Sequence, residues 1–165
     1  MARGVERLEA PPPATLSAAL DDNGGLIFGG TVARSFESGG GQWLVQGGGG
    51  FRDRPGVSIP SSDSGIPGNA ALLSADGDLR LNSDTRHADA FVSVRYQGDE
   101  GGWMSLTSSG FDVERGVPPE IHEADPRLWR YPDQKRVITA VSGGTGRKET
   151  GWGMGDIEAI LGLDF

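Results

Sequence analysis

Glycine is the residue type that most limits what this chain can fold into. It accounts for 28 of the 165 residues, against a usual share of about 7%. Each interior glycine costs a helix about 1 kcal/mol relative to alanine. A helical bundle and a coiled coil are therefore excluded, and a β-rich domain with many tight turns is favoured. The apolar residues, 36% of the chain, are enough for one packed domain.

Charge and cysteine content exclude several classes of function. The formal net charge is −8, which disfavours nucleic acid as a partner because phosphate binding needs a basic surface. The absence of cysteine rules out disulfides, thiolate metal sites and a cysteine nucleophile. We find neither the apolar segment of a signal peptide nor an apolar run near 18 residues. We therefore expect a cytoplasmic protein with no membrane partner.

Short alternating or apolar segments between glycine-rich turns predict eight to ten strands and almost no helix. The clearest strand is 91–97, in which Val92, Val94 and Tyr96 face one way and Phe91, Ser93 and Arg95 the other. The other expected strands are 26–36 (broken or bulged at Gly29-Gly30), 42–46, 70–74, 78–82, 103–108, 128–131, 136–141 and 156–165. The expected glycine turns are 39–41, 47–50, 98–102 and 143–155.

This order of strands predicts the fold class and its boundaries. We expect residues 26–165 to form an all-β domain, an eight-stranded antiparallel up-and-down β-barrel, because closure removes exposed edges. A two-sheet sandwich is the alternative. Residues 1–25 are expected to be a flexible tail, with two helical turns over 14–20. The irregular segment 52–69 is either a lid-like functional loop or a mobile one, and 109–126 is expected to be a polar connection.

The familiar catalytic signatures are absent. The segment Gly143-Gly144-Thr145-Gly146-Arg147-Lys148 lacks the Gly-Lys-Ser/Thr spacing of a phosphate loop. The two histidines, His87 and His122, belong to no metal-binding spacing, and both lie in polar segments that are typical of solvated loops. We therefore expect no metal and no conventional nucleophilic site.

The segment 137–147, an apolar strand that enters Gly-Gly-Thr-Gly, carries a more specific signal. With the final strand that follows, it resembles the allene oxide cyclase barrel superfamily, which includes plant allene oxide cyclases, dirigent proteins and bacterial [4+2] cyclases of polyketide pathways. The resemblance covers residues 137–162. The chain departs from the family at 147–153, where Arg-Lys-Glu-Thr-Gly-Trp-Gly replaces an aromatic residue and a Gly-Ala-x-Gly element.

The resemblance implies a barrel with a ligand cavity along its axis and a cofactor-independent cyclase in natural-product biosynthesis. Such a cavity folds an apolar linear substrate so that its reacting ends meet, which lowers the barrier to ring closure. It also implies a possible homodimer or homotrimer. The alternatives are a non-catalytic, dirigent-like barrel that binds a small hydrophobic ligand, and a β-sandwich interaction module.

Under the cyclase hypothesis the aromatic residues are the candidate pocket. Tyr96 or Arg95 is the candidate catalytic group, since either could polarise a substrate carbonyl by hydrogen bonding. The alternative is that the aromatic residues pack the core and the charged ones lie on the solvated surface. The candidate substrate-binding residues are Trp43, Phe91, Trp103, Met104, Trp129, Tyr131, Trp152 and Glu158.

Overall fold

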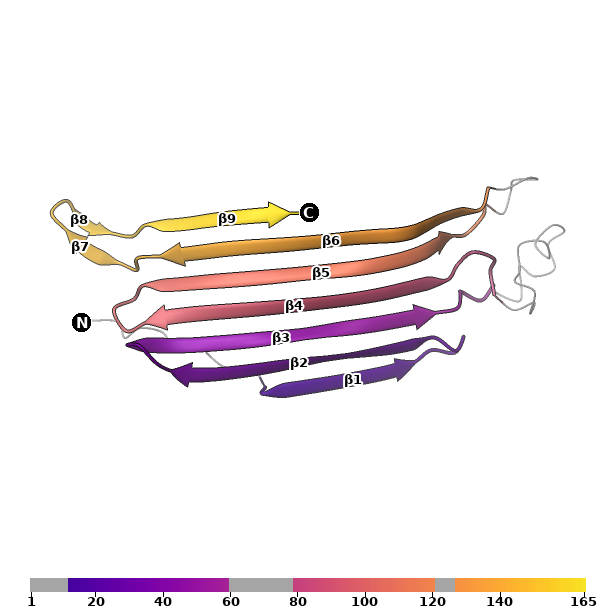
Figure 1. The fold of residues 1–165 in the computed structure, drawn as a ribbon, viewed down its shortest axis with the longest axis horizontal. Helices are drawn as coiled ribbons and strands as arrows, with labels where there is room; N and C mark the ends of the chain where they lie inside the picture. Colours follow the sequence, from indigo (N-terminus) through magenta and orange to yellow (C-terminus); the bar gives the residue numbers. More distant parts are fainter. Residues whose placement is uncertain (1–11, 60–78, 121–126) are drawn as a thin grey trace.

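The computed structural model describes residues 12–59, 79–120 and 127–165. They form one seven-stranded antiparallel sheet of order β1-β2-β3-β4-β5-β6-β9 (Figure 1). A small hairpin, β7–β8, projects between β6 and β9. The described residues contain no helix, and the prediction of an all-β antiparallel meander is confirmed. The strands are β1 (Ala14–Leu20), β2 (Leu26–Glu37), β3 (Gly41–Arg54), β4 (Thr85–Gly98), β5 (Trp103–Val117), β6 (Trp129–Gly144), β7 (Lys148–Thr150), β8 (Gly153–Gly155) and β9 (Glu158–Asp164).

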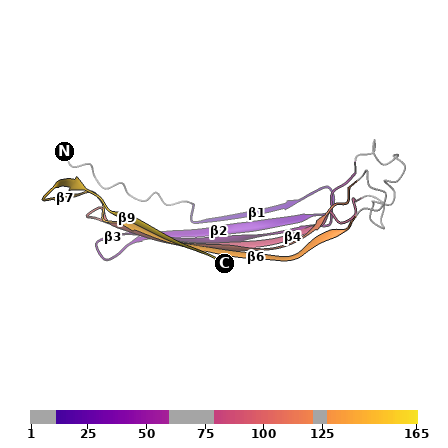
Figure 2. The same cartoon turned by 90° about the horizontal axis from the view of Figure 1, so that it is seen from above.

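The seven strands lie in one gently bent layer, as the edge-on view in Figure 2 shows. The outer strands β1 and β9 each pair on one side only within this sheet. Closure into a barrel therefore stays a prediction. The sheet has no interior in this arrangement, and most of its large hydrophobic side chains are exposed.

The helical turns expected over 14–20 were a wrong prediction, since this segment is β1 and the sheet begins there. Two helical turns are too short to be stable alone. Pairing with β2 over the whole length, from Ala14 opposite Val32 to Leu20 opposite Leu26, supplies the backbone hydrogen bonds instead. Segment 14–20 therefore belongs with the strands that follow it.

The break expected at Gly29-Gly30 and the turn expected at 47–50 were also wrong. Both glycine runs lie inside long strands and pair with each other, Gly29 opposite Gly50 and Gly30 opposite Gly49. A Cβ at Gly49 would lie 2.6 Å from the carbonyl oxygen of Asp89 on the neighbouring strand. These glycines thus permit a close approach of backbones within the sheet rather than a change of direction.

Two further boundaries differ from expectation. Residues 109–117, expected in a polar connection, continue β5, and the strands expected at 128–131 and 136–141 are parts of the single strand β6. Strand β6 continues through Pro132 because the register shifts there, between Val113 and Arg115 on β5, and a bulge tolerates the missing amide.

Several other expectations can be placed directly. The strands expected at 26–36, 42–46, 91–97 and 103–108 are confirmed as parts of β2, β3, β4 and β5, and the strand expected at 156–165 is confirmed over Glu158–Asp164, as β9. The strand expected at 78–82 was wrong over its described residues, where Leu79 forms only an isolated bridge with Ser58 and 81–82 form a turn. His87, expected in a solvated loop, lies within β4. The strand expected at 70–74, the tip of the 70–82 hairpin, most of the 52–69 loop and His122 lie outside the described residues.

The two faces of the sheet differ in polarity. Residues directly opposite each other on paired strands share a face. One face, here called the apolar face, carries Leu16, Leu20, Leu26, Phe28, Val32, Phe36, Trp43, Val45, Phe51, Val92, Val94, Tyr96, Met104, Leu106, Val137, Val141, Leu161 and Leu163. The opposite face, here called the polar face, is rich in serine and threonine. It also carries a smaller set of large hydrophobic side chains: Ile27, Leu44, Phe91, Trp103, Phe111, Val113, Ile138 and Ile160. On it, hydroxyl groups hydrogen-bond across strands between Thr15 and Thr31 (2.6 Å) and between Ser93 and Thr107 (3.1 Å).

The β1–β2 turn is held by the Asp21 carboxylate. This group accepts hydrogen bonds from the Gly25 amide at 2.6 Å, the Asn23 amide at 3.0 Å and Arg54 Nε at 2.9 Å. The Gly25 amide above all, with Arg54 and Asn23, lowers the pKa of this carboxyl below its ordinary value. The charged form is therefore favoured in the folded state more than in the unfolded chain.

Substitution Asp21→Asn is expected to destabilise the fold at neutral pH and not in strong acid. A lowered folded pKa gives stability that is complete above the unfolded value of about 3.9 and is lost as the pH falls through the folded pKa. The measurement is the denaturant midpoint of wild type and variant from pH 7 to pH 2. The two midpoints should converge at the acid end, and a difference that is constant with pH would contradict the role of the charge.

Candidate functional site

The densest aromatic group lies on the apolar face, near the β2–β3 turn. Phe36, Trp43, Tyr96 and Met104 stand opposite one another on four successive strands, and we call this set the aromatic row. The ring centroids of Trp43 and Tyr96 are 4.8 Å apart, and those of Phe36 and Trp43 are 6.4 Å apart and nearly parallel. The register of the sheet brings together three of the predicted residues, Trp43, Tyr96 and Met104, with Phe36, which we had not singled out.

The Tyr96 hydroxyl is engaged with the chain itself. It lies 3.2 Å from the carbonyl oxygen of Gly39 and 3.3 Å from that of Gly40, and it donates to this turn. A Cβ at Gly41 would lie 2.6 Å from the Tyr96 ring. The ring therefore lies over Gly41, in the space that a side chain at this position would occupy. To polarise a substrate carbonyl, as expected of a catalytic Tyr96, the hydroxyl must leave these acceptors.

Arg95, the other candidate catalytic group, lies on the polar face. Its guanidinium carbon is 5.8 Å from the centroid of the Trp103 ring, within the range of a cation–π contact. A Cβ at Gly144 would lie 2.6 Å from Trp103 Nε1 and 3.3 Å from Glu158 Cγ, so both side chains border this glycine. Arg95, Trp103 and Glu158 thus gather on the face opposite Tyr96. Phe91 lies on the same polar face, further along β4.

The remaining predicted residues lie apart from both groups. Trp129 and Tyr131 begin β6 at the opposite end of the sheet, where the Arg115 guanidinium lies 5.1 Å from the Tyr131 ring. Trp152 occupies the turn between β7 and β8 and is fully exposed. The eight predicted substrate-binding residues therefore do not line one pocket in this arrangement.

The glycines create a shallow trough across the apolar face. Gly30, Gly49, Ala90 and Gly110 stand in one row on β2 to β5, so this row is lower than its neighbours. A depression of about 360 Å³ lies over the β4–β6 part of this region, and the Asp112–Lys135 ion pair (3.6 Å) closes one end. The expected strand 103–108 ends before this row, whereas β5 in fact continues to Val117. The alternation of Leu106, Ser108 and Gly110 is the signal that would have extended it.

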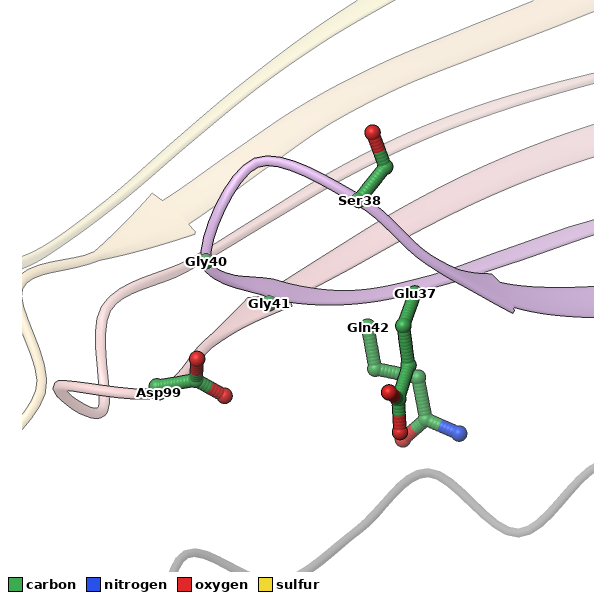
Figure 3. Close-up of a pocket in the computed structure, with 6 residues that line it drawn as sticks. All are labelled: Glu37, Ser38, Gly40, Gly41, Gln42 and Asp99. Atoms are coloured by element: carbon green, nitrogen blue, oxygen red, sulfur yellow. The ribbon is translucent and has the colours of Figure 1, made fainter.

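A second depression lies at the β2–β3 turn and is polar. It has a volume of about 460 Å³ and is lined by Glu37, Ser38, Gly40, Gly41, Gln42 and Asp99. In Figure 3 the Glu37 and Gln42 side chains lie side by side and point the same way, while Ser38 points away from them. None of the predicted site residues lines this depression.

The charged side chains pair mainly on the polar face and at the strand ends. Arg136 donates to both carboxylate oxygens of Asp164, at 2.9 Å and 2.5 Å, and joins β6 to β9. This hydrogen bond lowers the pKa of Asp164 below its ordinary value and raises that of Arg136. At the other end of the sheet, Arg130 pairs with Asp84 and lowers the pKa of that carboxyl in the same way. These pairs hold neighbouring segments of the sheet together. The three carboxyl groups with a lowered pKa are those of Asp21, Asp84 and Asp164, and each is paired with an arginine.

Neither a metal-binding cluster nor a known relative points to the activity. Among residues 12–59, 79–120 and 127–165, no three His, Asp or Glu side chains gather where they could hold a metal ion, and no helix is long and apolar enough to cross a membrane. Comparisons with protein-family models, curated proteins and solved structures gave no match.

Proposed function

We propose that the protein binds apolar molecules through its apolar face. The observation that carries the proposal is the concentration of large hydrophobic side chains on one face of the sheet, across all seven strands. Many of these side chains are widely exposed: Leu16 is 92% exposed, Leu161 66% and Val32 62%. Contiguous exposed apolar surface marks an interaction site in a folded protein.

The size of this face supports the proposal. At about 4.8 Å between strands and about 3.3 Å per residue, the apolar rows cover roughly 30 Å by 26 Å. The largest patch on an ordinary soluble monomer is about 300–600 Å². An apolar area larger than this needs a partner that removes it from water, since each Å² left exposed forgoes about 25 cal/mol.

We also propose that the sheet closes through its two edge strands. Both β1 and β9 have a free edge in the described sheet, and both carry leucines on the apolar face. An odd number of antiparallel strands places the two edges in the same direction. Contact between β1 and β9 is therefore parallel, unlike the wholly antiparallel seam of the eight-stranded barrel that we expected.

The cyclase predicted from the Gly-Gly-Thr-Gly resemblance is a narrower form of this proposal. It requires closure with the apolar face inward, so that Trp43, Tyr96 and Met104 surround the substrate. Arg95, Trp103 and Glu158 would then lie outside the cavity. Ring closure of a linear polyene by the purified chain, with no added cofactor, is the measurement that separates catalysis from binding.

A charge placed within the apolar face is expected to weaken binding of an apolar probe. The probe is diphenylhexatriene, an uncharged polyene whose fluorescence rises on leaving water. Val141→Asp, at a position whose cross-strand neighbours are Leu106 and Leu161, removes an apolar contact and adds a charge that resists burial, so the affinity should fall roughly tenfold or more. Titration of the probe into lipid-free protein gives the affinity.

The matched control for this experiment is Ser142→Asp, since Ser142 is the next residue of β6 and lies on the polar face. This variant should bind the probe as wild type does. Equal losses in the two variants, or wild-type protein that leaves the probe dark, would overturn the proposed function.

A further inference from the structure

We propose that the apolar partner is the hydrocarbon interior of a lipid bilayer, crossed by the strands with the apolar face toward the lipid. This inference rests on the proposed function and names the partner of the same surface. It departs from the expected absence of a membrane partner, and it requires closure with the apolar face outward, the opposite of what the cyclase requires. It is carried by the height of the apolar rows, by what borders them at each end, and by what lies on the opposite face.

The height of the apolar rows matches a bilayer. On β3 they run from Trp43 to Phe51, roughly nine residues, where a tilted strand needs about nine to eleven to cross. The distance along the strand is about 26 Å, close to the apolar band of about 25 Å that lipid-embedded sheets present. On β2 the same rows run from Phe28 to Phe36, because these residues stand opposite Phe51 and Trp43.

Aromatic side chains border the apolar rows at both ends, as aromatic girdles do at the two surfaces of a bilayer, although only the border with Trp43 and Tyr96 carries amphipathic rings. The aromatic row, with Trp43 and Tyr96, forms one border. Phe28 and Phe51 form the other, with ring centroids 5.4 Å apart. Two aromatic borders about 26 Å apart are expected of a surface that crosses a bilayer and are not required for binding a small ligand.

Charges on the apolar face lie mostly at and beyond the Phe51 border. Asp53, Arg86 and Glu114 stand in the next row outward, and Asp112 and Lys135 stand level with Phe51 on β5 and β6. The mixture of both signs complements zwitterionic headgroups. A sheet lying flat on a membrane would press these charges toward the acyl chains, and strands that cross the bilayer place them in the headgroup layer.

Between the two aromatic borders lie three polar residues, and each has a way to avoid bare exposure to hydrocarbon. Ser108 and Thr139 stand opposite each other, and their hydroxyl groups hydrogen-bond at 2.9 Å. Arg34 lies one row from Phe36, so its long side chain can extend past the border to the headgroups.

The polar face has the chemistry expected of the side turned away from lipid. Its hydroxyl groups satisfy one another across strands, as in the pair Ser93–Thr107, and its Arg136–Asp164 pair is hydrogen-bonded. Edge backbone groups must also be paired inside hydrocarbon. The contact between β1 and β9 proposed above meets that requirement.

The test is folding of the full chain into dilauroylphosphatidylcholine vesicles, diluted from urea and followed by flotation. We expect wild-type protein to float with the vesicles. Val92 lies in the middle row of the apolar face and is 48% exposed. Val92→Arg should lower the ratio of vesicle-bound to unbound protein about 30-fold or more, the loss expected for a cation near the bilayer midplane. Ser93→Arg, its neighbour on the polar face, should change this ratio less than threefold.

A second variant reports depth and does not depend on the folding of Val92→Arg. Val92→Trp should add fluorescence that lipids brominated near the chain ends quench, whereas lipids brominated near the headgroup should leave it largely unquenched. Quenching only by the shallow label would mean that the sheet lies on the surface, and it would overturn the crossing.

The outcomes separate the bilayer from other partners. Wild-type protein that binds diphenylhexatriene without lipid but stays behind on flotation would overturn the bilayer and leave the proposed function standing. A stable dimer in water that Val92→Arg dissociates, with no flotation, would assign the apolar face to a second copy and overturn the bilayer. Failure of both flotation and probe binding would overturn the inference and the proposed function together.

Discussion

Replacing Gly146 with alanine should lower the free energy of unfolding by about 3 kcal/mol or more, one of the largest effects of any single glycine substitution. Gly146 has a φ of +67°, a conformation that L-residues rarely adopt. A Cβ there would lie 2.3 Å from the carbonyl oxygen of Gly101, in the β4–β5 turn. Backbone strain and a backbone collision therefore act together. Denaturant unfolding under conditions in which the wild type folds gives the value.

Gly39→Ala is the matched control. Gly39 has nearly the same φ, +66°, but a Cβ there would meet nothing within 4 Å. Gly39→Ala should lower the free energy of unfolding only through the strain of a positive φ, by about 1–2 kcal/mol. Equal losses for the two variants would contradict the contact between the turns, since only the shared backbone strain would then remain.

The Gly-Gly-Thr-Gly segment ends β6 and holds two turns together. Gly143 and Gly144 end a strand, whereas Gly146 lets two turns at the same end of the sheet touch. The Thr145 side chain hydrogen-bonds back to the turn. Its hydroxyl donates to the Gly146 carbonyl at 3.1 Å and accepts from the Ile157 amide at 3.2 Å. The segment therefore has a structural role: it ends β6 and packs against the β4–β5 turn.

The alternation along β4 was predictable because a period of two is a local property. Val92, Val94 and Tyr96 share one face, and Phe91, Ser93 and Arg95 share the other, as expected. The same rule separates the two candidate catalytic groups, since adjacent strand residues point to opposite faces. What the pattern could not decide is which of the two faces turns outward.

The glycine runs could not be interpreted from the sequence because their conformation depends on a partner far along the chain. Gly29-Gly30 and 47–50 resemble turns when read locally. In the sheet the two runs lie side by side. Because neither run has side chains, the backbones of β2 and β3 can approach each other closely there. Strand lengths were underestimated for the same cause, since neighbours with long strands extend a weak segment such as 109–117.

The aromatic row was only partly predictable. Trp43, Tyr96 and Met104 were candidates one by one, because aromatic and long apolar side chains lie near strand ends. Their contact depends on the register of three strand pairs, which short turns such as 38–40 fix. Trp129 and Trp152 also lie near strand ends, but Trp129 begins β6 at the opposite end of the sheet and Trp152 lies in the β7–β8 turn.

Asn82→Ala should lower the free energy of unfolding by about 3 kcal/mol, from two separate causes. Asn82 is the described non-glycine residue with a positive φ, 55°. Its Nδ2 donates to the Val117 carbonyl at 2.9 Å and to the Trp129 carbonyl, and its Oδ1 accepts from Arg130. One side chain thus joins the segment before β4 to the end of β5 and the start of β6. Alanine strains the backbone and removes all three bonds.

Asn82→Gly separates the two causes. Glycine adopts the positive φ without strain and still removes the hydrogen bonds, so its cost should be about 2 kcal/mol. Alanine should therefore be the worse substitution by about 1 kcal/mol in denaturant unfolding. A glycine variant as stable as wild type would show that the side chain contributes nothing to the junction of β5 and β6. A glycine variant as unstable as the alanine one would place the whole effect in the hydrogen bonds.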